Sequence, residues 1–104
     1  MAFVRLNTQQ INDWASFHLV CKEDFGFPDF YGKNMNAWID CLSYLTENDG
    51  MMRFVLVENE MLHIEVTETK DFNTRLPDIL DALVECSAFV NKRYEKPKIS
   101  LIFL

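Results

Sequence analysis

Residues 27–42 read FPDFYGKNMNAWIDCL, and the spacing within this stretch decides how the whole chain is interpreted. Pro28 and the pair Tyr31-Gly32 predict a turn, because proline and glycine interrupt regular structure. Asn34 follows and can cap a helix, since its side-chain oxygen accepts a hydrogen bond from a backbone amide in the first turn. The stretch therefore predicts a loop that leads into a helix over residues 34–45.

One face of this helix carries three polar residues. Asn36, Asp40 and Ser43 are spaced i, i+4 and i+7, so they share that face. Asp40 is the only charged residue of the helix, and the aromatic Phe30 and Tyr31 precede it closely. Few charges and nearby aromatic rings are typical of the core of a protein interface. The same composition fits a mostly buried helix whose Asp40 bonds a backbone group, and the residues alone leave both interpretations open.

The composition is that of an ordinary globular protein. The chain has 104 residues, of which 49% are hydrophobic and 25% charged, so we expect a single domain over residues 1–104. Its net charge of −6 repels nucleic-acid backbones and attracts a basic protein partner. We expect no signal peptide and no membrane span, because the chain lacks a basic start before an apolar run and a sufficiently long apolar stretch. These features predict a cytoplasmic protein that binds neither nucleic acid nor membrane directly.

The rest of the chain alternates between helix and strand patterns. We expect a strand at 2–6, a helix from Asn12 or Asp13 to Phe25, a hairpin of 53–57 and 61–67 turning at Asn59, a helix capped by Asn73 or Thr74, and a strand at 99–104. The last strand, ISLIFL, is almost wholly apolar, which is typical of a central strand covered on both faces. The order predicts a small α/β domain with a mainly parallel sheet of three or four strands packed with helices.

The sequence offers no catalytic or metal-binding motif. His18 is expected on the apolar stripe of the first helix and His63 inside a strand, so both are better explained as structural residues than as bases. Cys21, Cys41 and Cys86 fall among apolar residues, which favours buried free thiols in a reducing compartment. No signature pairs Cys41 with the base that a nucleophile requires. We therefore expect no enzymatic activity, no cofactor and no metal.

Residues 28–42, PDFYGKNMNAWIDCL, resemble the signature of the barstar family, intracellular inhibitors of bacterial ribonucleases whose members carry a pattern close to PxYYGxNLDALWDCL. The matching positions are Pro28, Tyr31, Gly32, Asn34, Ala37, Asp40, Cys41 and Leu42. The order of an N-terminal strand, a first helix, a late helix and an apolar C-terminal strand also agrees with the family. The resemblance implies a barstar-like fold, to which an insertion at residues 52–61 would add a hairpin strand.

The resemblance also implies a mechanism. In the family, the loop and the second helix plug the active site of the ribonuclease, and a helix aspartate lies where the RNA phosphate would lie. Asp40 is the matching residue, and the implied partner-binding set is Phe30, Tyr31, Gly32, Asn34, Asn36, Asp40, Ser43 and Glu95. Asn36 replaces a second acid of the best-known members. Glu95 lies among lysines and an arginine where the family is acidic.

Two functions are compatible with these observations. The first is a barstar-like inhibitor or immunity protein that blocks a basic nuclease, either a bacterial ribonuclease or a nuclease toxin. The second is an interaction module that keeps the scaffold but binds another partner, or that self-associates through the edge of the expected hairpin. Asp40 is central to the first function and the hairpin edge to the second.

Overall fold

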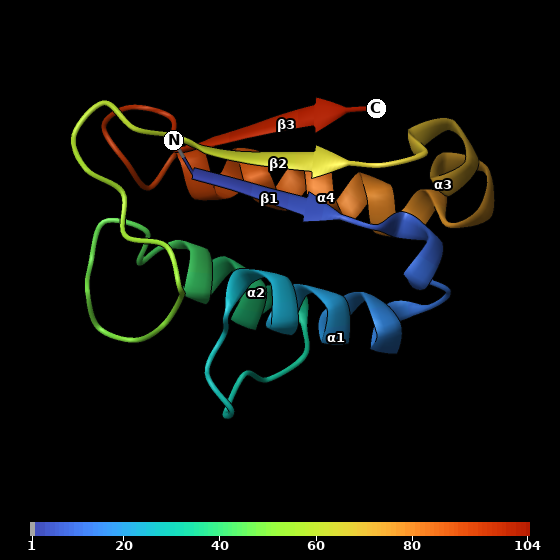
Figure 1. The fold of residues 1–104 in the computed structure, drawn as a ribbon, viewed down its shortest axis with the longest axis horizontal. Helices are drawn as coiled ribbons and strands as arrows, with labels where there is room; N and C mark the ends of the chain where they lie inside the picture. Colours follow the sequence, from blue (N-terminus) through green and yellow to red (C-terminus); the bar gives the residue numbers. More distant parts are fainter. Residues whose placement is uncertain (1) are drawn as a thin grey trace.

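The computed structural model describes residues 2–104, which alternate between strands and helices (Figure 1). The elements in chain order are β1 (Ala2–Leu6), a short 3-10 helix η1 (Thr8–Gln10), α1 (Trp14–Phe25), α2 (Met35–Leu42), β2 (Leu62–Val66), α3 (Thr69–Arg75), α4 (Pro77–Asn91) and β3 (Ile99–Phe103). Asp13 caps α1 through a capping box, since its side chain accepts a hydrogen bond from the Ser16 amide at 2.8 Å. The α/β class and the predicted strands at both ends of the chain are confirmed.

The sheet is parallel and has the strand order β1-β2-β3. Its register places Val4 beside Ile64, and Ile64 beside Leu101. The expectation of a mainly parallel sheet with three or four strands is therefore confirmed. The expectation of a central C-terminal strand is wrong, because β2 occupies the centre and β3 an edge.

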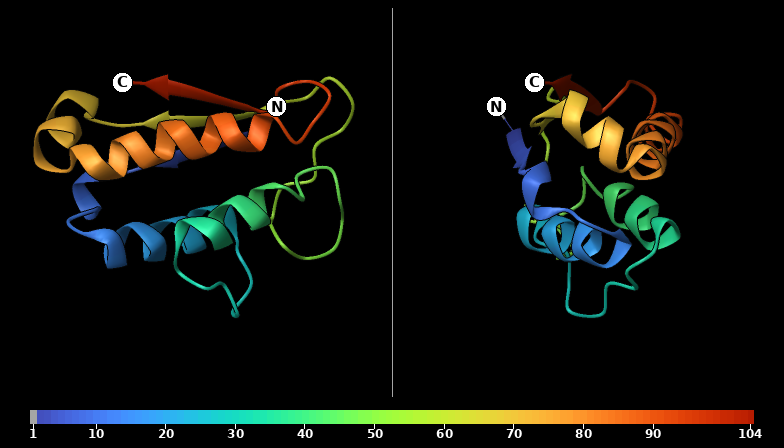
Figure 2. Two further views of the ribbon diagram at one scale, coloured as in Figure 1. Left: turned by 180° about the vertical axis from the view of Figure 1, so that it is seen from behind. Right: turned by 90° about the vertical axis from the view of Figure 1, so that its right-hand side faces the viewer.

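Helices cover only one face of this sheet (Figures 1 and 2). Val4 and Leu6 point to the helices and are buried, whereas Phe3 and Arg5, which alternate with them along β1, are exposed. The opposite face is partly closed by pairs within the sheet, such as the Arg5 Nε donating to the Glu65 carboxylate at 3.1 Å. The apolar strand β3 can thus lie at an edge of the sheet. It pairs with β2 along one edge and packs on α4 with one face.

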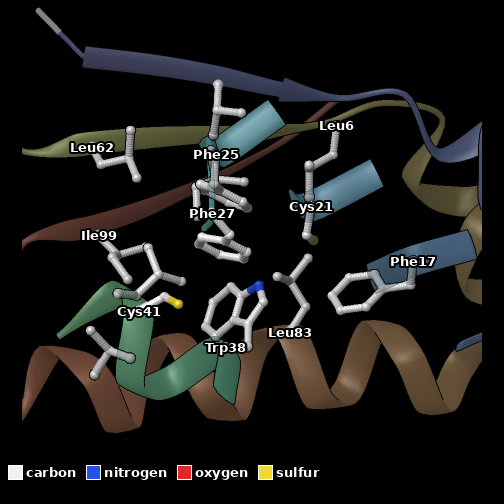
Figure 3. Packing of buried hydrophobic residues seen from close by; sticks show 14 of the residues in the cluster. Leu6, Phe17, Cys21, Phe25, Phe27, Trp38, Cys41, Leu62, Leu83 and Ile99 are labelled. Carbon is white, nitrogen blue, oxygen red and sulfur yellow. The ribbon is translucent and has the colours of Figure 1, made fainter. Parts of the chain in front are cut away.

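The core lies between the sheet, α1, α2 and α4 (Figure 3). Trp38 is fully buried at its centre and meets the ring of Phe25 edge-on, with ring centroids 6.2 Å apart. Cys21 and Cys41 are buried free thiols as expected, whereas Cys86 is only half-buried. The buried face of α2 is therefore the one that carries Trp38, Cys41 and Leu42, and it fixes the direction of the opposite face.

The expected hairpin is wrong. Residues 53–57 form no strand, because their backbone groups pair elsewhere: the Arg53 amide donates to the Phe25 carbonyl at 3.0 Å, and the Leu56 amide donates to the Leu45 carbonyl at 2.7 Å. Asn59 does adopt the positive φ, +67°, expected of a turn residue. Within residues 2–104 the region 52–61 therefore adds no strand and no hairpin edge.

The helix α2 ends at Leu42, three residues earlier than expected. The Tyr94 hydroxyl explains this end, because it donates to the Leu42 carbonyl at 2.8 Å and accepts from the Leu45 amide at 3.0 Å. These two bonds satisfy backbone groups that continued helix would otherwise pair. The chain can turn away from α2 at Ser43 without leaving them unsatisfied.

The helix α3 was not expected, and the predicted cap of the last helix is wrong. Asn73 and Thr74 lie inside α3, and α4 begins at Pro77 after Leu76, which makes no side-chain capping bond. Proline suits the first helical position, since its missing N–H group would have no partner there. Pro77 therefore marks the start of α4 more directly than any capping residue.

Candidate partner-binding site

The loop before α2 is anchored by Tyr31. This residue was predicted to touch a partner, but it is buried, with only 4% of its surface exposed. Its hydroxyl lies 2.7 Å from the Nδ1 atom of the buried His18. Burial lowers the pKa of His18 and raises the pKa of Tyr31, so both groups are neutral and the hydroxyl can donate to the imidazole. Tyr31 thus positions the loop from inside and does not form its outer surface.

Asn34 turns the loop into α2 as expected. Its Oδ1 atom accepts a hydrogen bond from the Ala37 amide at 2.8 Å, and its Nδ2 atom donates to the Gly32 carbonyl at 3.4 Å. Lys33, which lies between Gly32 and Asn34, takes a left-handed conformation with φ of +56°. The amide of Asn34 is therefore engaged in fixing the start of the helix.

The outward face of α2 is open to solvent. Asn36 is exposed, and 67% of the Asp40 side chain is accessible. Phe30 is 75% exposed and lies with Gly32 and Asp40 around a shallow depression of about 170 Å³. Within residues 2–104 the Asp40 carboxylate accepts no hydrogen bond from a backbone amide. The interpretation of Asp40 as a buried acid bonded to the backbone is therefore wrong.

A cation from the end of α4 lies beside Asp40. The Arg93 Nη1 atom donates to the Ser43 hydroxyl at 3.1 Å and lies 3.9 Å from the Asp40 Oδ1 atom. Ser43 itself donates to the Ile39 carbonyl at 2.7 Å, so its oxygen is fixed as an acceptor. The sequence had suggested Ser43 as part of the site but not Arg93, which follows it 50 residues later. No local pattern could have paired them.

Glu95 lies apart from this cluster. It is exposed in the segment after α4 and borders a second depression, of about 390 Å³, that Arg93, Lys96 and Lys98 also line. The structure brings together Phe30, Gly32 and Asp40, and connects Ser43 to them through Arg93. Glu95 shares the lining of its depression with Arg93, which in turn contacts Ser43 and lies beside Asp40.

The chemistry of the described residues favours binding over catalysis. Burial, with smaller effects of nearby carboxylates, raises the pKa of the Cys41 thiol to about 11, so the nucleophilic thiolate is scarce at neutral pH. Residues 2–104 contain no cluster of three histidine, cysteine or acidic residues suited to a metal ion. None of the helices in this range is long and apolar enough to cross a bilayer.

A search of the curated proteins finds no match. The family model described as Barstar (barnase inhibitor) matches residues 1–104. The helices packed on a three-stranded parallel sheet agree with this family's fold. The chain therefore belongs to the Barstar (barnase inhibitor) family.

Proposed function

We propose that this chain inhibits a barnase-type ribonuclease by inserting α2 and the loop before it into the active site, with Asp40 in place of an RNA phosphate. Members of the Barstar family are inhibitors of ribonucleases and not enzymes. The observation that carries the proposal is the exposed Asp40 carboxylate on a face of α2 without another acid. A carboxylate that is desolvated among the arginine, lysine and histidine groups of a ribonuclease forms strong charge-assisted hydrogen bonds.

The surroundings of Asp40 support the same role. Phe30 and Tyr44 are 75% and 40% exposed, and their rings can cover the edge of a charged contact and exclude water from it. The loop is already fixed by the contact between Tyr31 and His18 and by the cap at Asn34. A preformed loop lowers the conformational entropy that binding would cost.

The partner follows from the same chemistry. A basic nuclease of bacterial origin would be attracted by the net charge of −6, and the chain would act in the cytoplasm as its immunity protein or antitoxin. Self-association through a hairpin edge has no support, since residues 53–57 form no strand. We therefore propose inhibition and do not propose a separate self-association function.

The test is the inhibition of RNA cleavage by a barnase-type ribonuclease. The variant Asp40→Ala should lose about 2–5 kcal/mol of binding free energy, a range for charged protein interfaces in general to which the barnase–barstar pair itself contributes. Asp40→Asn, which keeps the shape, should lose most of the same energy. Asp81→Ala removes another exposed acid, on α4, and at about 0.15 M salt it should inhibit like the wild type. Undiminished inhibition by Asp40→Ala would contradict the mechanism.

A further inference from the structure

The surface around Asp40 already contains a fixed cation. The guanidinium of Arg93 donates to Ser43 at 3.1 Å, lies 3.9 Å from the Asp40 carboxylate, and its Cζ atom lies 5.2 Å from the ring centroid of Phe89. Three contacts from two helices and a cap residue restrict where this side chain can go. Arg93 is still 44% exposed, so a partner that reaches Asp40 also meets Arg93.

Arg93 also belongs to a basic region that continues away from Asp40. The depression of about 390 Å³ after α4 is lined by three cations, Arg93, Lys96 and Lys98, against the two carboxylates of Glu58 and Glu95. The depression beside α2 has Asp40 as the charged residue of its lining, and the Arg93 Nη1 atom lies 3.9 Å from the Asp40 Oδ1 atom. Two regions of opposite charge thus adjoin, and Arg93 lies where they meet.

This arrangement restricts the partner. A ribonuclease site made of cations alone would attract Asp40 but would place like charges against Arg93, and such a juxtaposition costs several kcal/mol. Within residues 2–104 the Nε and Nη2 groups of Arg93 donate no hydrogen bond, so these donors remain for a partner. A carboxylate is the acceptor that a guanidinium binds best, through two parallel hydrogen bonds.

We propose that Arg93 is a second partner contact, and that it selects nucleases which place a carboxylate beside the cations that bind Asp40. The inference rests on the proposed function, because it assumes that Asp40 enters a nuclease active site. It adds a requirement that Asp40 does not impose. The partner's site must carry both signs of charge. It needs cations where Asp40 binds and a carboxylate where Arg93 binds.

The first experiment measures the dissociation constant of the chain with a barnase-type ribonuclease by calorimetry. Arg93→Ala should weaken binding by roughly tenfold or more, and Arg93→Lys, which keeps the charge without the paired donors, should lie between it and the wild type. Lys70→Ala removes an exposed cation on α3, at the other end of the molecule, and controls for net charge (Figure 1). Thermal unfolding of each variant checks that the fold is intact. If Arg93→Ala binds as tightly as the wild type, or more tightly, Arg93 does not contribute to binding and the inference is wrong.

The second experiment identifies the partner's carboxylate. Each acid of the nuclease active site is replaced by its amide. One of these nuclease variants should bind the wild-type chain more weakly than the unmodified nuclease does. The same nuclease variant should bind Arg93→Ala with the affinity of the unmodified nuclease. A double-mutant cycle then shows coupling to Arg93 that exceeds the coupling to Asp40. If no acid couples to Arg93 while Asp40→Ala abolishes binding, the inference fails and the proposed function stands. If Asp40→Ala binds normally, or the wild type does not bind at all, the proposed function fails and the inference fails with it.

Discussion

His18 connects the buried core to the loop before α2 through a hydrogen bond to Tyr31. Burial lowers the pKa of His18 from its ordinary value of 6.5, so the folded protein resists protonation that the unfolded chain accepts. The stabilising contribution of neutral His18 is therefore complete above pH 6.5, and it decreases as the pH falls below 6.5 towards the folded-state pKa.

We expect the free energy of unfolding to decrease below pH 6.5, with a slope from His18 of at most about 1.4 kcal/mol per pH unit. Urea unfolding between neutral pH and pH 5 measures the slope. His18→Gln retains a polar side chain but cannot titrate, so its profile should be flatter over this range even if its stability at neutral pH is lower. Equal slopes in the wild type and in His18→Gln would show that the imidazole titrates alike in both states.

Individual site residues were predictable where their role is local. The cap of α2 follows from the Asn34 side chain, and helical spacing places Asp40 on the face opposite the buried stripe. That this face is open to solvent could not be decided from the residues, because the same composition also fits a buried helix. The position of Tyr31 was not predictable, since an aromatic ring in a loop can face either the solvent or the core. Its buried partner His18 lies in α1, away from this loop in the sequence. Arg93 depends on the packing of α4 against α2, which no local pattern encodes.

At the scale of elements, the end of α1 depends on Gly26. This residue ends the helix with a left-handed φ of +71°, and a Cβ atom there would lie 2.8 Å from the Arg53 Cβ atom. Gly50 has a similar φ of +84° but no heavy atom within 4 Å of the same position. The two glycines therefore share the conformational strain that alanine would meet, and only Gly26 adds a steric overlap.

Gly50→Ala should lower the free energy of unfolding by about 1–2 kcal/mol, the cost of a left-handed conformation for alanine. Gly26→Ala should lower it further, by about 1–3 kcal/mol, because the added methyl group must displace Arg53 from its contact with the end of α1. Chemical denaturation of both variants gives the difference directly. A Gly26→Ala variant no less stable than Gly50→Ala would mean that the segment around Arg53 moves aside freely.

Elements were predictable from sequence where local signals and packing agree. The strand β1, the cap of α1 and the start of α2 have clear patterns, and each forms as expected. Residues 53–57, RFVLV, have the composition of a strand, but their backbone donors bind the end of α1 and Leu45. The start of α3 has no side-chain cap, so it left no signal in the sequence. Tertiary hydrogen bonds decided these segments.

For the whole molecule, the alternation of strands and helices was enough to predict the class and the parallel sheet, but not its order. The apolar run ISLIFL was assigned to the centre on the assumption that parallel strands are covered on both faces. Here the helices cover one face only, and β3 forms an edge (Figure 2). The same one-sided layering brings the C-terminal ends of α2 and α4 together, which creates the surface shared by Asp40 and Arg93.

The charge of the whole molecule should steer the encounter with a basic nuclease, and salt decides which charges contribute. Glu47 and Asp49 follow α2 in the chain. The Asp49 Oδ1 atom accepts a hydrogen bond from the Met51 amide at 3.1 Å, and Met51 lines the depression that contains Asp40. Asp78 and Asp81 lie near the start of α4, away from Arg93 at its far end. Neutralising either pair removes two charges from the net −6, so the two variants differ only in where the charge is lost.

At about 0.01 M salt the Debye length is about 30 Å, similar to the 36 Å long axis of the molecule, so both variants should associate several-fold more slowly than the wild type. At about 0.15 M salt the Debye length falls to about 8 Å, and only the charges near the contact remain effective. There, Glu47→Gln with Asp49→Asn should still slow association, whereas Asp78→Asn with Asp81→Asn should match the wild type. Stopped-flow association rates with a barnase-type ribonuclease at the two salt concentrations measure this. If both variants slow association equally at the higher salt concentration, the contact does not lie at α2. The charges near the start of α4 would then act on the partner as strongly as the charges after α2.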